Sequence, residues 1–210
     1  MARKTAPQAS FDDQLVLFRY FLHELKIDSL GALSVKLNSS EYEGFNESGG
    51  TYFCDYIARI SKMKGAAITP EKLRLYDANI CRHTRQVGEK RGGLRWKYFQ
   101  YVALLFTEIY LDRYFTDAEG FCADLNNWLS TKRTESFGLI DFQPYTVDKL
   151  NKLAFMCATG SGKTLIMHMN ILQFLHYFKR AKRMNSKLSI NKVIVLAPNE
   201  GMSNQHLEEL

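Results

Sequence analysis

Hydrophobic residues recur at helical spacing through the first two thirds of the chain. In residues 11–26, Leu15, Phe18, Leu22 and Leu25 fall on one helical face, because each lies three or four positions from the next. Four more helices are predicted from apolar spacing and from helix-start residues. They cover residues 51–62, 70–87, 94–115 and 117–131.

The pattern changes in the last third of the chain. A short apolar run at 153–157 leads into a glycine-rich loop, and an apolar helix is predicted over 163–180. A β-branched run follows at 193–196, after a basic loop at 179–187. Strand, helix and strand in this order predict a β-α-β unit with a right-handed crossover in a parallel sheet. The predicted fold class is therefore α/β, with a helical region before the sheet.

The glycine-rich loop reads T-G-S-G-K-T over residues 159–164. Glycines leave successive backbone N–H groups free to point at one anion, and the following helix adds the partial positive charge of its N-terminus. Lys163 is expected to reach the β- and γ-phosphates of ATP, and the Thr164 hydroxyl to hold Mg²⁺. These two residues are the predicted catalytic groups. The predicted ATP-binding residues of the loop are Thr159, Gly160, Ser161, Gly162, Lys163 and Thr164.

The general P-loop, or Walker A, pattern has a glycine where this chain has Cys157. A T-G-S-G-K-T loop with a non-glycine first position resembles motif I of the superfamily 2 helicases and translocases. In particular, it is similar to their DEAD/DEAH-box and type III restriction-subunit branch. The resemblance implies a helical N-terminal region at 1–92 and the beginning of a RecA-like ATP-binding domain at 93–210. The segment at about 117–131 would then be a helical insert.

A second motif follows the β-branched run. Residues 197–210 read A-P-N-E-G-M-S-N-Q-H-L-E-E-L and resemble motif Ia of the same helicases. In that family the turn and helix hold the nucleic-acid backbone, and exposed N–H groups with short polar side chains can do so without reading sequence. The sequence departs from the DEAD-box form at Glu200, where an acid replaces a base, and His206 is expected on the helix surface. The resemblance assigns nucleic-acid binding to Pro198, Asn199, Ser203 and Gln205.

A third segment, residues 95–103, resembles the R-x-Y-Q-x-x-A stretch upstream of motif I, in which an amide reads the adenine edge. Gln100 is the matching residue, and a glutamine amide can donate and accept at once, as adenine requires. Gln143, in the sequence Phe-Gln-Pro, is the alternative because it lies closer to the loop along the chain.

Basic residues are concentrated between Arg59 and Lys97. Eleven bases against three acids give this segment 11 − 3 = +8, whereas the whole chain carries +6. With Arg82 and Arg85 on the helix at 70–87, the segment could follow a nucleic-acid backbone or could be a solvated helix face. The expected polymer is DNA, with RNA as the alternative. The resemblance also implies restriction-modification or defence-system subunits as partners.

The chain shows no secretory signal, no apolar run of membrane-spanning length and no cysteine pair at metal spacing, so a cytoplasmic protein without membrane contact is expected. No Asp-Glu strand end and no second motor domain follow the two motifs. We therefore expect these residues to be the front part of an ATP-dependent helicase or translocase, and to be inactive alone. The alternative is a non-catalytic nucleotide- or DNA-binding module or regulatory subunit. A P-loop kinase is a third hypothesis, and motif Ia argues against it.

Overall fold

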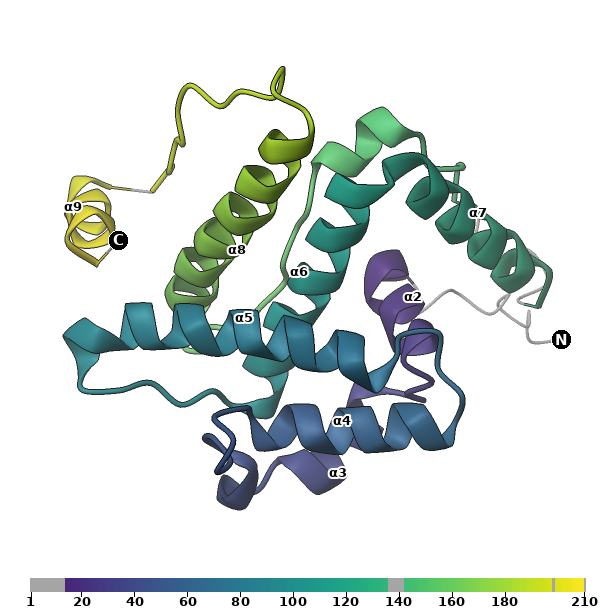
Figure 1. Ribbon diagram of the computed structural model, residues 1–210, viewed down its shortest axis with the longest axis horizontal. Helices are drawn as coiled ribbons and strands as arrows, with labels where there is room; N and C mark the ends of the chain where they lie inside the picture. Colours follow the sequence, from purple (N-terminus) through teal and green to yellow (C-terminus); the bar gives the residue numbers. More distant parts are fainter. Residues whose placement is uncertain (1–13, 136–141, 198, 210) are drawn as a thin grey trace, which may run out of the picture.

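The computed structural model describes residues 14–135, 142–197 and 199–209. Within these ranges every regular element is a helix, as Figure 1 shows. The α-helices are α2 (Val16–Glu24), α3 (Leu30–Leu37), α4 (Tyr52–Met63), α5 (Pro70–Gly88), α6 (Tyr98–Thr116), α7 (Ala118–Glu135), α8 (Lys163–Met184) and α9 (Glu200–Glu209). Short 3-10 helices are η1 (Ser40–Tyr42), η2 (Glu89–Arg91) and η3 (Val147–Asn151).

The predicted α/β fold with a parallel sheet is wrong, because no strand forms in the described part of the chain. The β-type pairing found there is one isolated antiparallel bridge between Phe45 and Thr51. The two predicted strands at 153–157 and 193–196 have no regular structure and form no ladder with another described segment. Strand propensity stabilises a structure only where the side chains pack on a half-buried pleated surface. Both runs lack that surface, since Met156 is 70% exposed and Leu196 is 91% exposed.

Most of the predicted helices are confirmed, and both α4 and α5 have a threonine N-cap, which was predicted for α5. Thr51 Oγ1 accepts the Cys54 backbone N–H at 3.0 Å, and Thr69 Oγ1 accepts the Lys72 N–H at 3.3 Å with Pro70 at the first helical position. The helix α8 is longer than expected, so the segment predicted as a basic loop at 179–187 is helical as far as Met184.

The helix α6 lies at the centre of the fold. In Figure 1 it rises between α8 on one side and α2 and α7 on the other, while α4 and α5 lie side by side across its lower end. Its residues from Leu104 to Asp112 are all buried, which confirms the predicted mostly buried helix. The rings of Phe21 from α2, Phe106 from α6 and Phe121 from α7 lie within contact distance, so α2 and α7 share this core.

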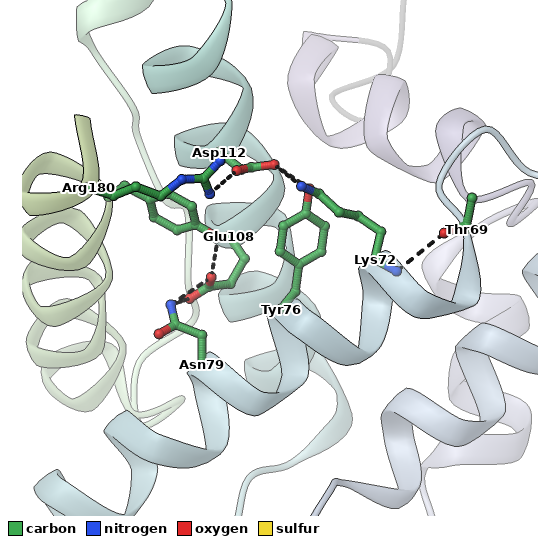
Figure 2. Close-up of polar contacts among 8 residues, drawn as sticks. Thr69, Lys72, Tyr76, Asn79, Glu108, Asp112 and Arg180 are labelled. Carbon is green, nitrogen blue, oxygen red and sulfur yellow. Dashed lines mark hydrogen bonds and ion pairs between the residues drawn. The ribbon is translucent and has the colours of Figure 1, made fainter. Parts of the chain in front are cut away.

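A polar cluster is buried where α5, α6 and α8 meet. Glu108 of α6 is fully buried, and its carboxylate accepts hydrogen bonds from Asn79 Nδ2 (2.7 and 2.8 Å), Gln173 Nε2 (2.7 Å) and Tyr177 OH (2.6 Å). One turn later, Asp112 accepts hydrogen bonds from Tyr76 OH (2.9 Å) and Arg180 Nη1 (2.8 Å), and Lys72 Nζ lies 2.7 Å away. Figure 2 shows both acids of α6 facing α5, with Arg180 reaching Asp112 from α8. We call this cluster, whose members are Lys72, Tyr76, Asn79, Glu108, Asp112, Gln173, Tyr177 and Arg180, the Glu108–Asp112 cluster.

The two acids of the cluster differ in their pKa. Burial raises the pKa of Glu108, and the hydrogen bonds from Tyr177, Asn79 and Gln173 only partly offset it. Burial acts in the same direction on Asp112, but the bonds to Lys72, Tyr76 and Arg180 outweigh it and lower the pKa of that carboxyl.

The predicted boundary between residues 92 and 93 falls in the turn from α5 to α6. Gly92 and Gly93 have φ angles of 68° and 103°, which glycine adopts without strain. The helices before and after this turn pack against each other, and the division into two regions stays a prediction. Among the described helices, none is long and apolar enough to cross a membrane.

Candidate nucleotide and nucleic-acid sites

The loop at 159–164 is a tight turn that leads directly into α8. Gly160 and Gly162 have φ angles of 75° and 84°, in the left-handed region where a side chain is strained. The Ser161 N–H donates to Ala158 O at 3.2 Å, and Gly162 is the N-cap residue of α8. The T-G-S-G-K-T sequence thus forms a tight glycine turn, although the described residues form no sheet beside it.

Lys163 is the first residue of α8 and its side chain is exposed. Its ammonium group turns back over the loop and donates to Ala158 O at 3.1 Å and Cys157 O at 3.4 Å. A cation held over a turn of carbonyl groups, beside the positive end of a 22-residue helix, is well placed to exchange those acceptors for phosphate oxygens.

The loop is joined to α6 by Gln100, one of the two predicted adenine-reading residues. Gln100 Nε2 donates to Ser161 O at 2.8 Å, and Gln100 Oε1 accepts the Lys97 backbone N–H at 2.9 Å. Contact with Gly162 is close, since a Cβ atom there would lie 2.5 Å from Gln100 Nε2. The structure therefore places Gln100 against the loop, while its role in reading adenine stays a prediction. Both ends of its amide are already bonded within the protein, and Gln143 is exposed.

The remaining loop residues offer polar groups to a ligand. Thr159 and Gly160 are exposed, and Thr164 is half-buried. Ser161 Oγ is covered and has no hydrogen-bond partner among the described residues. A covered hydroxyl without a partner is costly, and a bound anion would satisfy it. The loop residues therefore fit a phosphate group.

Two contacts of α8 fix the direction in which the loop points. The face of α8 that carries Ile166, Met169, Gln173 and Tyr177 is buried against α5 and α6. At the far end, Arg180 is bonded to the Glu108–Asp112 cluster. The helix that begins at Lys163 is therefore held along its length.

The second predicted site lies at the start of α9. Asn199 is exposed, and its carbonyl accepts the Ser203 N–H at 3.2 Å and the Ser203 hydroxyl at 3.3 Å. Pro198 lies outside the described residues, and the side chain of Gln205 is likewise not described. The expectation that His206 is a surface residue is wrong, because it is 6% exposed and its Nδ1 lies 3.3 Å from His168 Nε2 of α8. This histidine pair connects α9 to the helix that follows the loop.

Many basic side chains of the segment from Arg59 to Lys97 already have contacts within the protein. Lys64, Lys72, Arg74 and Lys97 lie in ion pairs with Asp28, Asp112, Glu71 and Glu43. Arg82 and Arg85 are exposed, and each has a protein contact: Arg82 Nη2 lies 2.9 Å from His176 Nδ1, and Arg85 Nη2 donates to Gly49 O at 3.2 Å. The net charge counted over this segment leaves out the acids of other segments that pair with its bases, so it overstates the charge at this surface.

In the described ranges no group of three or more His, Cys, Asp or Glu side chains could hold a metal ion. Comparisons with protein-family models, curated proteins and solved structures found no significant match. The described residues form an all-α structure with a glycine-rich turn at the start of α8, the longest of the described helices.

Sequence reasoning missed the Glu108–Asp112 cluster. The available signal was two acids four residues apart in a segment that is otherwise apolar almost all the way round. Such acids lie on one helical face and need buried partners, which only the tertiary structure identifies.

Proposed function

We propose that this chain binds ATP with Mg²⁺ through residues 159–164, as the ATP-binding part of a helicase or translocase acting on DNA or RNA. The observation that carries the proposal is the position of Lys163. Its ammonium lies over the turn formed by two left-handed glycines, at the positive end of α8. The resemblance to superfamily 2 motif I supports the same ligand.

The loop residues would divide the work of holding ATP. Lys163 would neutralise the β- and γ-phosphates, while backbone N–H groups of the turn would cradle them. Thr164 would contribute its hydroxyl to Mg²⁺, which shields phosphate charge during phosphoryl transfer. Gln100 would position Ser161 and Gly162, to which it is already joined.

A nucleic-acid strand would lie at Asn199 and Ser203, at the start of α9. The contact between His206 and His168 supports this placement, because it connects α9 to α8 and so to the ATP loop. The site belongs in the cytoplasm, where both ATP and nucleic acid are present, and restriction or defence-system subunits would be its protein partners.

The test is the affinity for a fluorescent ATP analogue with Mg²⁺. Lys163→Ala should weaken binding about tenfold or more, since a charge-assisted contact to phosphate is lost. Lys182→Ala, at the exposed far end of the same helix, is the matched control and should change nothing. Equal affinity in Lys163→Ala and in the unchanged protein would refute the proposal.

The alternative is a non-catalytic nucleotide- or DNA-binding module or regulatory subunit. One observation favours it: both ends of the Gln100 amide are bonded within the protein. Such a module would bind ATP and GTP equally and would hydrolyse neither in the presence of single-stranded DNA. A preference for ATP together with DNA-stimulated hydrolysis favours the helicase.

A further inference from the structure

The surface where α5 and α8 pack against each other carries exposed arginines from both helices. Arg82 of α5 is exposed, and its Nη2 lies 2.9 Å from His176 Nδ1 of α8. On α8, His176, Arg180 and Arg183 follow one another at intervals of four and three residues, so they share one helical face. Both arginines of this face are exposed. The contact between Arg82 and His176 therefore joins the basic side chains of two helices into one surface.

The pKa of His176 shows that these charges lie close together. Partial burial lowers this pKa, and the positive charges of three arginines lower it further, whereas Asp112 raises it. The imidazole is therefore neutral at pH 7 and adds a hydrogen-bonding group between the cations. The three arginines are Arg82, Arg180 and Arg183.

The acids near this surface are buried beneath it and do not neutralise all of its cations. Asp112 is 6% exposed and is shared by Arg180 of α8 and Lys72 of α5, as Figure 2 shows, so one carboxylate faces two cations. Glu108 is fully buried and accepts its hydrogen bonds from neutral side chains. With both acids counted as charged, four cations leave 4 − 2 = +2. The four cations are Lys72, Arg82, Arg180 and Arg183.

Two of the arginines have no acidic ion-pair partner among the described residues. Arg82 bonds to Asn79 Oδ1 and lies against His176, and both of these groups are neutral. Arg183 is exposed, and its side chain has no ion pair or hydrogen bond with the described part of the chain. A guanidinium group without an acidic partner keeps its charge available to an anion, and its planar fork matches two oxygens of a phosphate.

We propose that the surface formed by Arg82, His176, Arg180 and Arg183, which we call the α5–α8 surface, binds the phosphate backbone of a single nucleic-acid strand. His176 and Arg183 are seven residues apart, which is about 10 Å along α8. Cations spread over such a length suit successive phosphates of a strand better than one compact anion. Contacts of this kind hold the backbone without reading base sequence.

The proposal rests on the proposed function for the class of polymer and adds a second contact region to it. No residue of the α5–α8 surface belongs to the loop at 159–164 or to the start of α9. Substitutions in the α5–α8 surface therefore test it separately from Lys163 and from Ser203.

The experiment is a fluorescence-anisotropy titration of the chain with a labelled single-stranded oligothymidylate at several salt concentrations. Arg183→Gln removes a charge without removing a protein contact, so the melting temperature should stay the same. The affinity should fall about fivefold at 0.1 M salt, and the logarithmic salt slope should become shallower by about 0.7, because one phosphate fewer is neutralised. Lys182→Gln, which removes an exposed charge from another face of α8, is the matched control and should change neither quantity.

Arg82 is tested with two variants, because it also has contacts within the protein. Arg82→Lys keeps the charge and loses the planar fork, whereas Arg82→Gln loses both. The affinity for the strand should therefore fall in Arg82→Lys and fall further in Arg82→Gln. Equal affinities in the two variants and the unchanged protein would contradict the role of this guanidinium.

The outcomes separate this surface from the strand site proposed at α9. A loss in Arg183→Gln with unchanged affinity in Ser203→Ala supports the α5–α8 surface and contradicts the site at α9. A loss in Ser203→Ala with none in Arg183→Gln has the opposite meaning and overturns the inference. Equal losses in Arg183→Gln and Lys182→Gln also overturn it, and so does equally strong binding to phosphatidylserine vesicles, which would indicate a membrane surface. Absence of saturable strand binding overturns both proposals.

Discussion

The polar groups of the Glu108–Asp112 cluster and those of the glycine-rich turn at 159–164 are satisfied in different ways. In the Glu108–Asp112 cluster, both acids accept hydrogen bonds from α5 and α8, and both acids are buried. In the turn, Ser161 Oγ is covered without a partner among the described residues, and Lys163 bonds only to carbonyl groups of its own turn. The apolar runs on either side of α8 are exposed as well. Stability therefore resides in the helices, while the proposed chemistry lies where the fold leaves groups available.

The largest expected effect on stability comes from removing the Glu108 carboxylate from the Glu108–Asp112 cluster. Glu108→Ala leaves the donors of Asn79, Gln173 and Tyr177 without their acceptor and opens a void among three helices. Removing one member of a buried polar cluster should lower the free energy of unfolding by about 3 to 5 kcal/mol. Urea denaturation followed by circular dichroism measures this loss.

The matched control is Glu47→Ala, which removes the same group from an exposed turn. It should change the free energy of unfolding by less than about 0.5 kcal/mol. If Glu108→Ala were as mild as this control, the cluster would not hold α8 in place.

A somewhat smaller effect is expected from the pH dependence of His83, in α5. Burial lowers the pKa of His83 from 6.5 to about 4, and Arg82 and His176 add to the shift. On acidification, His83 therefore binds a proton at a higher pH in the unfolded chain than in the folded protein. The contribution of neutral His83 to the free energy of unfolding is complete above pH 6.5 and is lost between pH 6.5 and about 4. The size of this loss is about 2 to 3 kcal/mol.

Urea denaturation at a series of pH values between these limits tests the prediction. His83→Phe, which cannot titrate, should lose correspondingly less stability on acidification, and His23→Gln, an exposed control, should follow the unchanged protein. Parallel curves for His83→Phe and the unchanged protein would exclude this source of acid sensitivity.

The smallest effect on stability is expected in the turn itself. Alanine at Gly160 or Gly162 meets the same left-handed strain, about 1 kcal/mol. A Cβ atom at Gly160 has nothing within 4 Å, whereas at Gly162 it lies 2.5 Å from Gln100 Nε2. Gln100 can swing away, so the two variants should unfold within about 1 kcal/mol of each other. Nucleotide affinity should fall further in Gly162→Ala, because that variant also loses the bond from Gln100 to Ser161. Equal affinities would show that Gln100 does not position the turn.

Much of the helical fold was predictable because its signals are local. Thr51, Thr69 and Pro70 act through residues three or fewer positions away, and α4 and α5 begin where these residues indicate. The turn at 159–164 was predictable for the same reason, since the left-handed conformations of Gly160 and Gly162 follow from residue type.

The remainder depends on contacts between distant segments. The runs at 153–157 and 193–196 have strand composition, but extended residues gain stability only from neighbouring strands, which the described chain does not provide. His206 was predicted to be exposed because nothing in its own helix indicates a partner, and that partner is His168, 38 residues earlier. Gln100 was assigned to the correct neighbourhood, but its two hydrogen bonds could not be read from the motif.

Whether residues 159–164 bind nucleotide phosphates is tested most directly by an NMR titration of the isotope-labelled chain with ATP and Mg²⁺. We expect the backbone amide resonances of Gly160, Gly162, Lys163 and Thr164 to shift together with the side-chain amide of Gln100. We also expect these shifts to disappear in Lys163→Ala, while the resonances of the Glu108–Asp112 cluster stay in place. Saturable binding without shifts in the turn, or shifts that persist in Lys163→Ala, would contradict the proposed site.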